Sequence, residues 1–318
     1  MSIYKTLRGL MIKAPFAEKQ DLHGKTVIVT GCAPGSIGFE TAKTLASWGA
    51  TVIITTRSQT DTVVKALRVA AGAQGKVDGH SLDLTIADSV AEFVAWFEKN
   101  HGDRLDILVN NAGAHLDLLS QWKEPHLTAD GFEIQWRGNY LGVMHLTHLL
   151  LPLLKATGKK TGDARIVFVA SKMHTKGYNA GLSGDYPYNS WTAYGMSKLA
   201  IVHAAFEIQR RYAETDHLQA YCLHPGSVFT NVADKGLAGN PLIQTVRNAL
   251  APVERFGLLT PEEGAQTSVH CATSPNAVGG KYYKQCRPST ACADSADIAA
   301  ASNLWDQTQR DLAVITQR

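Results

Sequence analysis

Short runs of apolar and β-branched residues alternate along the chain with segments whose apolar residues recur every three or four positions. The runs predict about seven strands, at residues 25–30, 50–56, 77–83, 105–110, 165–170, 219–223 and 281–283. Helical patterns lie between them, at residues 37–50, 58–71, 85–97, 128–157, 194–213 and 298–315. Strands that alternate with helices predict an α/β fold with a parallel, doubly wound sheet.

The chain shows no repeat, linker or low-complexity stretch, so its 318 residues predict a single main domain over residues 25–318. Residues 1–24 form an N-terminal extension, in which apolar residues at helical spacing predict a short helix. Glycines and prolines interrupt short helical pieces between residues 226 and 260, and we expect this segment to act as a substrate lid.

Composition narrows the functional classes. The chain is 45% hydrophobic and 19% charged with a net charge of +3, and no basic run indicates a nucleic-acid partner. Five dispersed cysteines without metal-ligand spacing are typical of reduced thiols, so we expect a cytoplasmic protein without a bound metal. No apolar stretch is long enough to span a membrane. The longest, Leu141–Leu154, fits a buried helix or half of a homo-oligomer interface.

A glycine-rich turn follows the first predicted strand and precedes the first helix. It places Gly31, Gly35 and Gly38 within the segment TGCAPGSIG. Glycines allow the backbone to approach a pyrophosphate closely, and a helix N-terminus offers free N–H groups and a partial positive charge. Because a strand, a glycine turn and a helix follow one another here, the pattern predicts a dinucleotide site.

The second strand ends at Thr56 and Arg57, where NAD-binding folds usually carry an acidic residue for the ribose hydroxyls. A guanidinium at this position suits the additional 2′-phosphate of NADP. The alternative is a surface arginine without a ligand. We expect NADP(H) to be the cofactor.

Tyr194 and Lys198 are four residues apart on a predicted helix, so their side chains leave the same face. A tyrosine has a pKa of about 10, and a neighbouring cation favours the phenolate and lowers this value. A phenol tuned in this way is a candidate general acid and base. Such a spacing also occurs by chance on solvated helices, so the pair needs support from the rest of the chain.

Taken together, these motifs resemble those of the short-chain dehydrogenase/reductase family, from about Lys25 to the C-terminus. The matching segments are TGCAPGSIG, Asp83-Leu84, NNAG at Asn110–Gly113, Asn139, Ser171, Tyr194-x-x-x-Lys198 and HPGSVFT at His224–Thr230. The chain looks most like the branch of retinol dehydrogenases and WW-domain oxidoreductases. Its DGFEIQWRGNYLG, TPEEGAQT and GKYYKQC segments and its late Leu304-Trp305 have counterparts there.

The resemblance implies a role for each catalytic residue. Tyr194 would be the general acid in reduction and the base in oxidation, and Lys198 would hold the nicotinamide ribose and lower the Tyr194 pKa. Ser171 would hydrogen-bond the substrate oxygen, and Asn139 would anchor a water in the proton path. The residues implied in cofactor binding are Gly31, Gly35, Ser36, Ile37, Gly38, Arg57, Asp83, Leu84, Asn111, Ala112, Gly113, Pro225, Gly226, Val228 and Thr230.

The glycine loop departs from the usual family pattern T-G-x-x-x-G-x-G by one additional residue before Ile37. Either Gly35 or Ser36 therefore occupies the place of the middle glycine. Ketoreductase domains of fungal fatty-acid synthases have a similar Ser-Ile-Gly ending, which implies a loop that can hold the cofactor.

The sequence thus predicts an NADP(H)-dependent oxidoreductase that interconverts a ketone or aldehyde with an alcohol. The long, aromatic-bearing segment between Ser171 and Tyr194 favours a small-molecule substrate that is fairly bulky and apolar. Two alternatives stay open. The chain could bind NADP(H) as a regulator or scaffold without turnover, or it could be an epimerase or dehydratase like the extended relatives, which also use Tyr-x-x-x-Lys.

Overall fold

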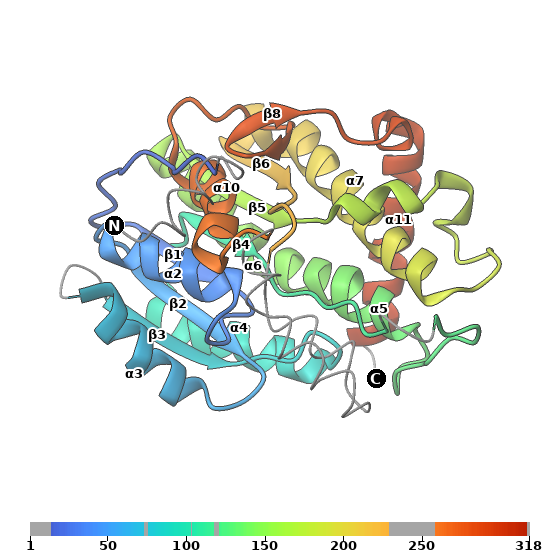
Figure 1. Ribbon diagram of the computed structural model, residues 1–318, viewed down its shortest axis with the longest axis horizontal. Helices are drawn as coiled ribbons and strands as arrows, with labels where there is room; N and C mark the ends of the chain where they lie inside the picture. The colour runs from blue at the N-terminus through green and yellow to red at the C-terminus, as the bar shows by residue number, and fades with distance from the viewer. Residues whose placement is uncertain (1–13, 73–75, 103, 118–120, 229–257, 317–318) are drawn as a thin grey trace.

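A computed structural model of the chain describes residues 14–72, 76–102, 104–117, 121–228 and 258–316 (Figure 1). Within these ranges one sheet has the strand order β3-β2-β1-β4-β5-β6-β7-β8. The strands are β1 (Thr26–Val29), β2 (Thr51–Thr56), β3 (Lys76–Ser81), β4 (Ile107–Asn110), β5 (Ala164–Val169), β6 (Leu218–Leu223), β7 (Tyr282–Lys284) and β8 (Arg287–Ser289). Every neighbouring pair is parallel except β7 and β8, which are antiparallel.

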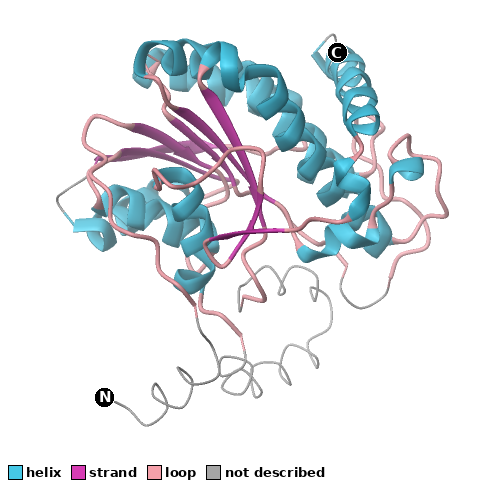
Figure 2. Ribbon diagram, turned by 90° about the horizontal axis from the view of Figure 1, so that it is seen from above, coloured by secondary structure: helices cyan, strands magenta, loops and turns pink. Residues whose placement is uncertain are grey.

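Helices cover both faces of this sheet, as Figure 2 shows. They are α2 (Ile37–Ser47), α3 (Thr60–Ala71), α4 (Ala87–His101), α5 (Ile134–Trp136), α6 (Gly142–Thr161), α7 (Ser190–Asp216), α10 (Pro261–Thr273) and α11 (Ile298–Thr316). The predicted α/β class with a doubly wound parallel sheet is confirmed. The eighth strand, β8, is a short antiparallel addition at the edge that the apolar pattern did not predict, because all three of its residues are exposed.

Alternate residues of the strands belong to two separate hydrophobic cores. On β1, Ile28 packs in the core beneath α4, α6 and α7, whereas Val27 and Val29 pack in the core beneath α2, α3 and α10. Because successive strand side chains point to opposite faces, a central strand needs apolar residues at nearly every position. The continuous apolar runs of the sequence have this physical origin.

Several predicted boundaries differ from the observed ones, and two of these differences have a local cause. The third strand was expected to reach Asp83 but ends at Ser81, because Asp83 Oδ1 accepts hydrogen bonds from the N–H and the hydroxyl of Thr85 and turns the chain. The helical pattern was expected to begin at Thr128, but helical structure begins at Ile134. Before it, the Thr128 N–H donates to the Phe132 carbonyl in a turn.

Two predicted segments, the N-terminal helix and the substrate lid, lie largely outside the described residues. The expected N-terminal helix falls on residues 1–13, and most of the expected lid, with Thr230, falls on residues 229–257. Residues 14–24 contain no helix and run over the domain, where the Ala17 N–H donates to Gln266 Oε1 and Leu22 is buried.

Two further observations apply to the described residues. Their helices include none that combines the length and the apolar character needed to cross a membrane. Their His, Cys, Asp and Glu side chains form no group of three or more that could hold a metal ion. On α6, Leu146, Leu150 and Leu154 are fully buried within this single chain, so much of its apolar face is occupied by the chain's own core.

Candidate active site

The predicted motifs meet at the carboxyl ends of the central strands. The glycine loop follows β1, the NNAG segment follows β4, Ser171 follows β5 and His224 follows β6. Since β1, β4, β5 and β6 are neighbours and parallel, these loops lie along one edge of the sheet. Ligands of open α/β sheets bind at this edge.

Tyr194 and Lys198 lie in the first three turns of α7, which begins after the N-cap residue Asn189. The Asn189 side chain accepts a hydrogen bond from the Trp191 N–H and so fixes the start of the helix. The Lys198 side chain crosses to the end of β5, where Nζ donates to the Val169 carbonyl oxygen at 3.2 Å. This contact brings the helix pair beside Ser171, two residues further along the chain.

The NNAG segment packs directly on this lysine. A Cβ atom added to Gly113 would lie 2.8 Å from Lys198 Nζ and 3.2 Å from Asn139 Oδ1. A residue with a side chain at position 113 would therefore displace the ammonium group. Gly113 permits the close approach of the backbone to Lys198.

Asn139 lies in a π-helical segment, Arg137–Leu141, that separates α5 from α6. Its side chain makes two hydrogen bonds with Ala114: Oδ1 accepts from the backbone N–H and Nδ2 donates to the carbonyl oxygen, both at 2.8 Å. The side-chain amide is thus occupied in holding the end of the NNAG segment against the helix. The π-turn, a feature often found at functional sites, gives Asn139 this position.

Ser171 begins a 3-10 helix, Lys172–Lys176, directly after β5. Its hydroxyl oxygen accepts from the Met173 N–H at 3.2 Å, and its hydrogen bond with the Tyr194 side chain lowers the Tyr194 pKa. The structure therefore brings together all four residues predicted to be catalytic, Ser171, Tyr194, Lys198 and Asn139.

The electrostatics of the pair differ from the expectation. Burial raises the pKa of Tyr194 above its ordinary value, and the Ser171 contact only partly offsets this. Burial also lowers the pKa of Lys198 to about 8, with the nearby Cys222 thiol acting in the opposite direction. Lys198 Nζ lies 5.7 Å from the centre of the phenol ring, and desolvation is the largest cause of the net shift in the Tyr194 pKa.

The glycine loop is held by hydrogen bonds of the Ser36 side chain within the loop and to α2. Gly31 and Gly35 both have φ of +74°, a conformation that favours glycine. The Ser36 hydroxyl donates to the Gly31 carbonyl and accepts from the Phe39 N–H, so Ser36 is the N-cap of α2. Gly35 is thus the residue of the loop that uses a glycine-type backbone, and Ser36 caps the helix.

Asn111 and Gly38 join this loop to β4. The Asn111 Nδ2 group donates to the carbonyl oxygens of Thr30 and Gly31, and the backbone N–H groups of Asn111 and Ala112 donate to the Thr30 hydroxyl. A Cβ atom on Gly38 would lie only 2.4 Å from Asn111 Nδ2. Asn111, Ala112 and Gly38 therefore set the shape of the loop.

Arg57 is exposed just after β2, on the strand whose Thr55 carbonyl accepts from the Gly31 and Cys32 N–H groups. The backbone of Arg57 thus lies two residues beyond the point where β2 meets the glycine loop. Leu84 is buried, and its carbonyl oxygen accepts from Arg137 Nη1 at 2.6 Å.

The segment after β6 also lies at this edge. The Gly226 N–H donates to His224 Nδ1, and Gly226 has φ of +90°. Val228 forms an isolated parallel bridge with Leu259, which joins the two described ends of the chain around residues 229–257. Val228 also packs on Gly264, close to Ile37 at the start of α2.

The residues at this edge fit a dinucleotide cofactor. The glycine loop lies at the N-terminus of α2, an eleven-residue helix, and this place fits a phosphate. Lys198 is 3% exposed and has no acidic partner among its contacts in the described residues, so its N–H groups fit a ribose hydroxyl.

Sequence reasoning missed two residues of the site. His115, the second residue after NNAG, lies against Tyr194 with ring centres 4.6 Å apart, and it contacts Trp191 at 5.1 Å. Trp191 is three residues before Tyr194 on α7, a helical spacing that could have indicated a shared face. Nothing in the local pattern around His115 indicates that it meets α7.

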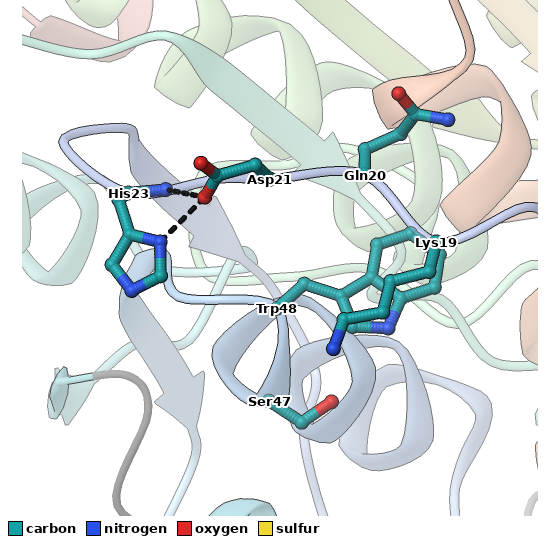
Figure 3. Close-up of a pocket in the computed structure, with 6 residues that line it drawn as sticks. All are labelled: Lys19, Gln20, Asp21, His23, Ser47 and Trp48. Carbon is teal, nitrogen blue, oxygen red and sulfur yellow. Dashed lines mark hydrogen bonds and ion pairs between the residues drawn. The ribbon is translucent and has the colours of Figure 1, made fainter.

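A surface pocket of about 390 Å³ lies elsewhere, beside the segments that lead into the amino ends of β1 and β2. It is lined by Lys19, Gln20, Asp21, His23, Ser47 and Trp48 (Figure 3). His23 Nδ1 lies 2.5 Å from Asp21 Oδ1 across its rim. None of the four residues predicted to be catalytic lines this pocket.

Comparison with known proteins agrees with the fold. The short chain dehydrogenase family profile matches residues 25–239. Human retinol dehydrogenase 11 is 34% identical over 308 residues, which covers 94% of this chain and 89% of that protein. Polyprenol dehydrogenase of Danio rerio is 32% identical over 292 residues, covering 90% and 86%. The crystal structure of the NADH-dependent reductase A1-R' complexed with NAD has a TM-score of 0.61 at 20% identity and covers 82% of this chain and 95% of its own.

The chain belongs to the short-chain dehydrogenase/reductase family, near its retinol dehydrogenase branch. It is therefore an oxidoreductase of a family that uses a nicotinamide cofactor to interconvert CH–OH and C=O groups.

Proposed function

We propose that this protein is an NADP(H)-dependent oxidoreductase that interconverts a ketone or aldehyde with an alcohol on a fairly bulky, apolar substrate, with Tyr194 as the general acid and base. The observation that carries the proposal is the convergence of three groups: the Tyr194 phenol, the Ser171 hydroxyl and the buried Lys198 ammonium meet at the end of β5. Neither a scaffold nor a simple nucleotide-binding domain requires this set.

In the reductive direction, the cofactor supplies the hydride. Tyr194 donates its proton to the carbonyl oxygen as negative charge develops there, and the Ser171 hydroxyl hydrogen-bonds the same oxygen. Lys198, held by the Val169 carbonyl, presents its remaining N–H donors to the ribose of the cofactor and stabilises the phenolate that Tyr194 becomes. The glycine loop from Gly31 holds the pyrophosphate at the start of α2.

The long segment between Ser171 and Tyr194 supports the choice of a bulky substrate. Its backbone is fixed on the C-terminal part of the chain, since the Asn179 N–H donates to Asp294 Oδ2 at 2.7 Å. The relatives named for retinol and polyprenol dehydrogenation also suggest a long apolar alcohol or its carbonyl form. The five cysteines are all free thiols, which supports a reducing compartment such as the cytoplasm.

The mechanism is tested by following NADPH consumption with a panel of aryl and alkyl ketones in wild type and Tyr194→Phe. We expect the variant to lose at least a hundredfold in kcat, the size of a general acid–base contribution, with cofactor binding retained. Equal turnover by the two proteins would refute the role of Tyr194.

Cofactor choice has its own test. Arg57→Ala should weaken NADPH far more than NADH, because only NADPH carries the 2′-phosphate that the guanidinium binds. Arg287→Ala is the matched control, since Arg287 is exposed on β8 at the far edge of the sheet. A uniform effect of Arg57→Ala on both dinucleotides would contradict the assignment.

A further inference from the structure

Two polar groups beside Tyr194 have no hydrogen-bond partner within the described part of the chain. His115 is 6% exposed and both of its ring nitrogens are buried and unpaired. The indole Nε1 of Trp191 is buried and unpaired as well. The His115 ring contacts both aromatic rings, with centres 4.6 Å from Tyr194 and 5.1 Å from Trp191.

Unpaired buried groups are costly, about 1–3 kcal/mol each, and native proteins leave few of them. The segment around His115 is nevertheless held firmly on both sides. Ala114 is bound by Asn139, and the Leu116 N–H donates to Gln135 Oε1 at 3.3 Å. The Gln135 amide in turn donates to the Ser190 carbonyl at the start of α7. The backbone on both sides of His115 is therefore held in place beside α7.

The chemistry of these groups limits what can satisfy them. Burial lowers the pKa of His115, so the ring is neutral near pH 7 and offers one donor and one acceptor. Trp191 adds a second donor. The Asp117 carboxylate is close enough to act on His115 electrostatically, which disfavours an anionic ligand here. The partner that matches His115 and Trp191 is a neutral oxygen that accepts a hydrogen bond and can also donate one.

We propose that His115 and Trp191 recognise a second, neutral oxygen of the substrate, a hydroxyl or carbonyl on the carbon next to the reacting carbonyl. Because the imidazole lies against the Tyr194 ring, a molecule whose carbonyl meets the phenol carries its neighbouring carbons past the imidazole. The inference rests on the proposed function and makes it more specific. The substrate class is that of α-hydroxyketones and 1,2-diketones with a bulky apolar body.

The test compares benzil, a 1,2-diketone with two phenyl groups, with deoxybenzoin, which has the same skeleton but lacks the second oxygen. The measured quantity is the ratio of the two kcat/KM values. Benzil is intrinsically more electrophilic, but this difference is the same for every variant, so it cancels when ratios are compared. We expect the wild-type preference for benzil to fall about tenfold in His115→Leu, as for the loss of one hydrogen bond.

Two further variants separate recognition from packing. Trp191→Phe keeps an aromatic ring and removes the N–H, so it should lower kcat/KM for benzil more than kcat/KM for deoxybenzoin. His115→Gln keeps a donor and an acceptor and should restore part of the preference. Equal losses with both ketones in His115→Leu, with no change in their ratio, would overturn the inference and leave the proposed function intact.

Binding gives a readout that does not depend on turnover. Benzil and deoxybenzoin are titrated into the NADP⁺ complex of each protein, and the quenching of tryptophan fluorescence reports their affinities. A tenfold weaker affinity for benzil alone in His115→Leu, with no reduction of either ketone by wild type, would support the recognition site and count against the proposed reaction. Unchanged relative affinity would overturn the recognition site.

Discussion

His174 Nδ1 lies 2.7 Å from the backbone oxygen of Ser171 and ties this serine to the C-terminal part of the chain. On the other side of the ring, Nε2 accepts from the Cys292 N–H at 3.0 Å. Since Nε2 is an acceptor, the proton of the neutral ring must be on Nδ1, which donates to Ser171. The side chain is buried, and burial lowers its pKa. The neutral His174 ring thus holds the backbone of Ser171 against the Cys292 segment.

We expect His174→Phe to lower kcat about tenfold with a smaller change in KM, because Ser171 loses the contact that fixes its backbone. Stability should also change with pH. The pKa of His174 is lower in the folded than in the unfolded chain, so below about pH 6.5 the unfolded chain takes up the proton and wild type loses stability. The difference in unfolding free energy between wild type and His174→Phe should therefore shrink as the pH falls below 6.5, measured by urea unfolding. A difference that is constant with pH would contradict a lowered His174 pKa in the folded chain.

Gly113→Ala tests the close approach of the NNAG segment to Lys198. The added methyl group would lie 2.8 Å from Nζ, the mobile end of a long side chain, so the lysine moves and the fold tolerates the change. We expect kcat/KM to fall about tenfold to a hundredfold, while the unfolding free energy changes by less than about 1 kcal/mol. Steady-state kinetics and thermal unfolding of the same preparation decide it. Full activity with unchanged stability would show that Lys198 does not need its present place.

Lys198→Met tests the burial of the ammonium in the absence of cofactor. Burial lowers the Lys198 pKa from 10.5 to about 8, so between these values the unfolded chain holds the proton and the folded chain does not. The unfolding free energy of wild type should rise with pH over this window, by about 3 kcal/mol relative to Lys198→Met. Urea unfolding of both proteins at pH 7.5 and pH 10 measures the change. An equal dependence of unfolding free energy on pH in the two proteins would contradict the lowered Lys198 pKa.

Asp130→Ala tests the buried arginine that supports Leu84. Arg137 is fully buried, and its Nε donates to Asp130 Oδ2 at 2.7 Å. Removal of the carboxylate leaves a buried cation without its counter-charge, and we expect a loss of about 3 kcal/mol in unfolding free energy. Asp163→Ala is the control, because Asp163 pairs with Arg165 but its own side chain is 41% exposed. The control should lose about 1 kcal/mol or less, and equal losses would argue against the buried pair.

Much of the fold could be predicted from local patterns. Apolar runs located the strands because central strands are buried on both faces. The start of α10 is equally local, because the Thr260 side chain accepts from the Glu263 N–H three residues further on. The glycine turn and the Tyr194–Lys198 spacing were also visible, because four residues span about one helical turn. These signals depend only on short-range geometry, which the sequence carries directly.

Other features depended on the tertiary structure. His115 meets Tyr194 only because β4 and β5 are neighbours in the sheet, and no local pattern specifies that order. The π-turn at Asn139 and the tautomer of His174 likewise depend on contacts with Ala114 and Cys292, which are distant in sequence. The direction of the Tyr194 pKa shift could not be predicted either, because it depends on how far folding removes the phenol from water. The sequence by itself determined the elements and the chemical groups of the site, and the packing of the elements decided which groups meet and how much water they retain.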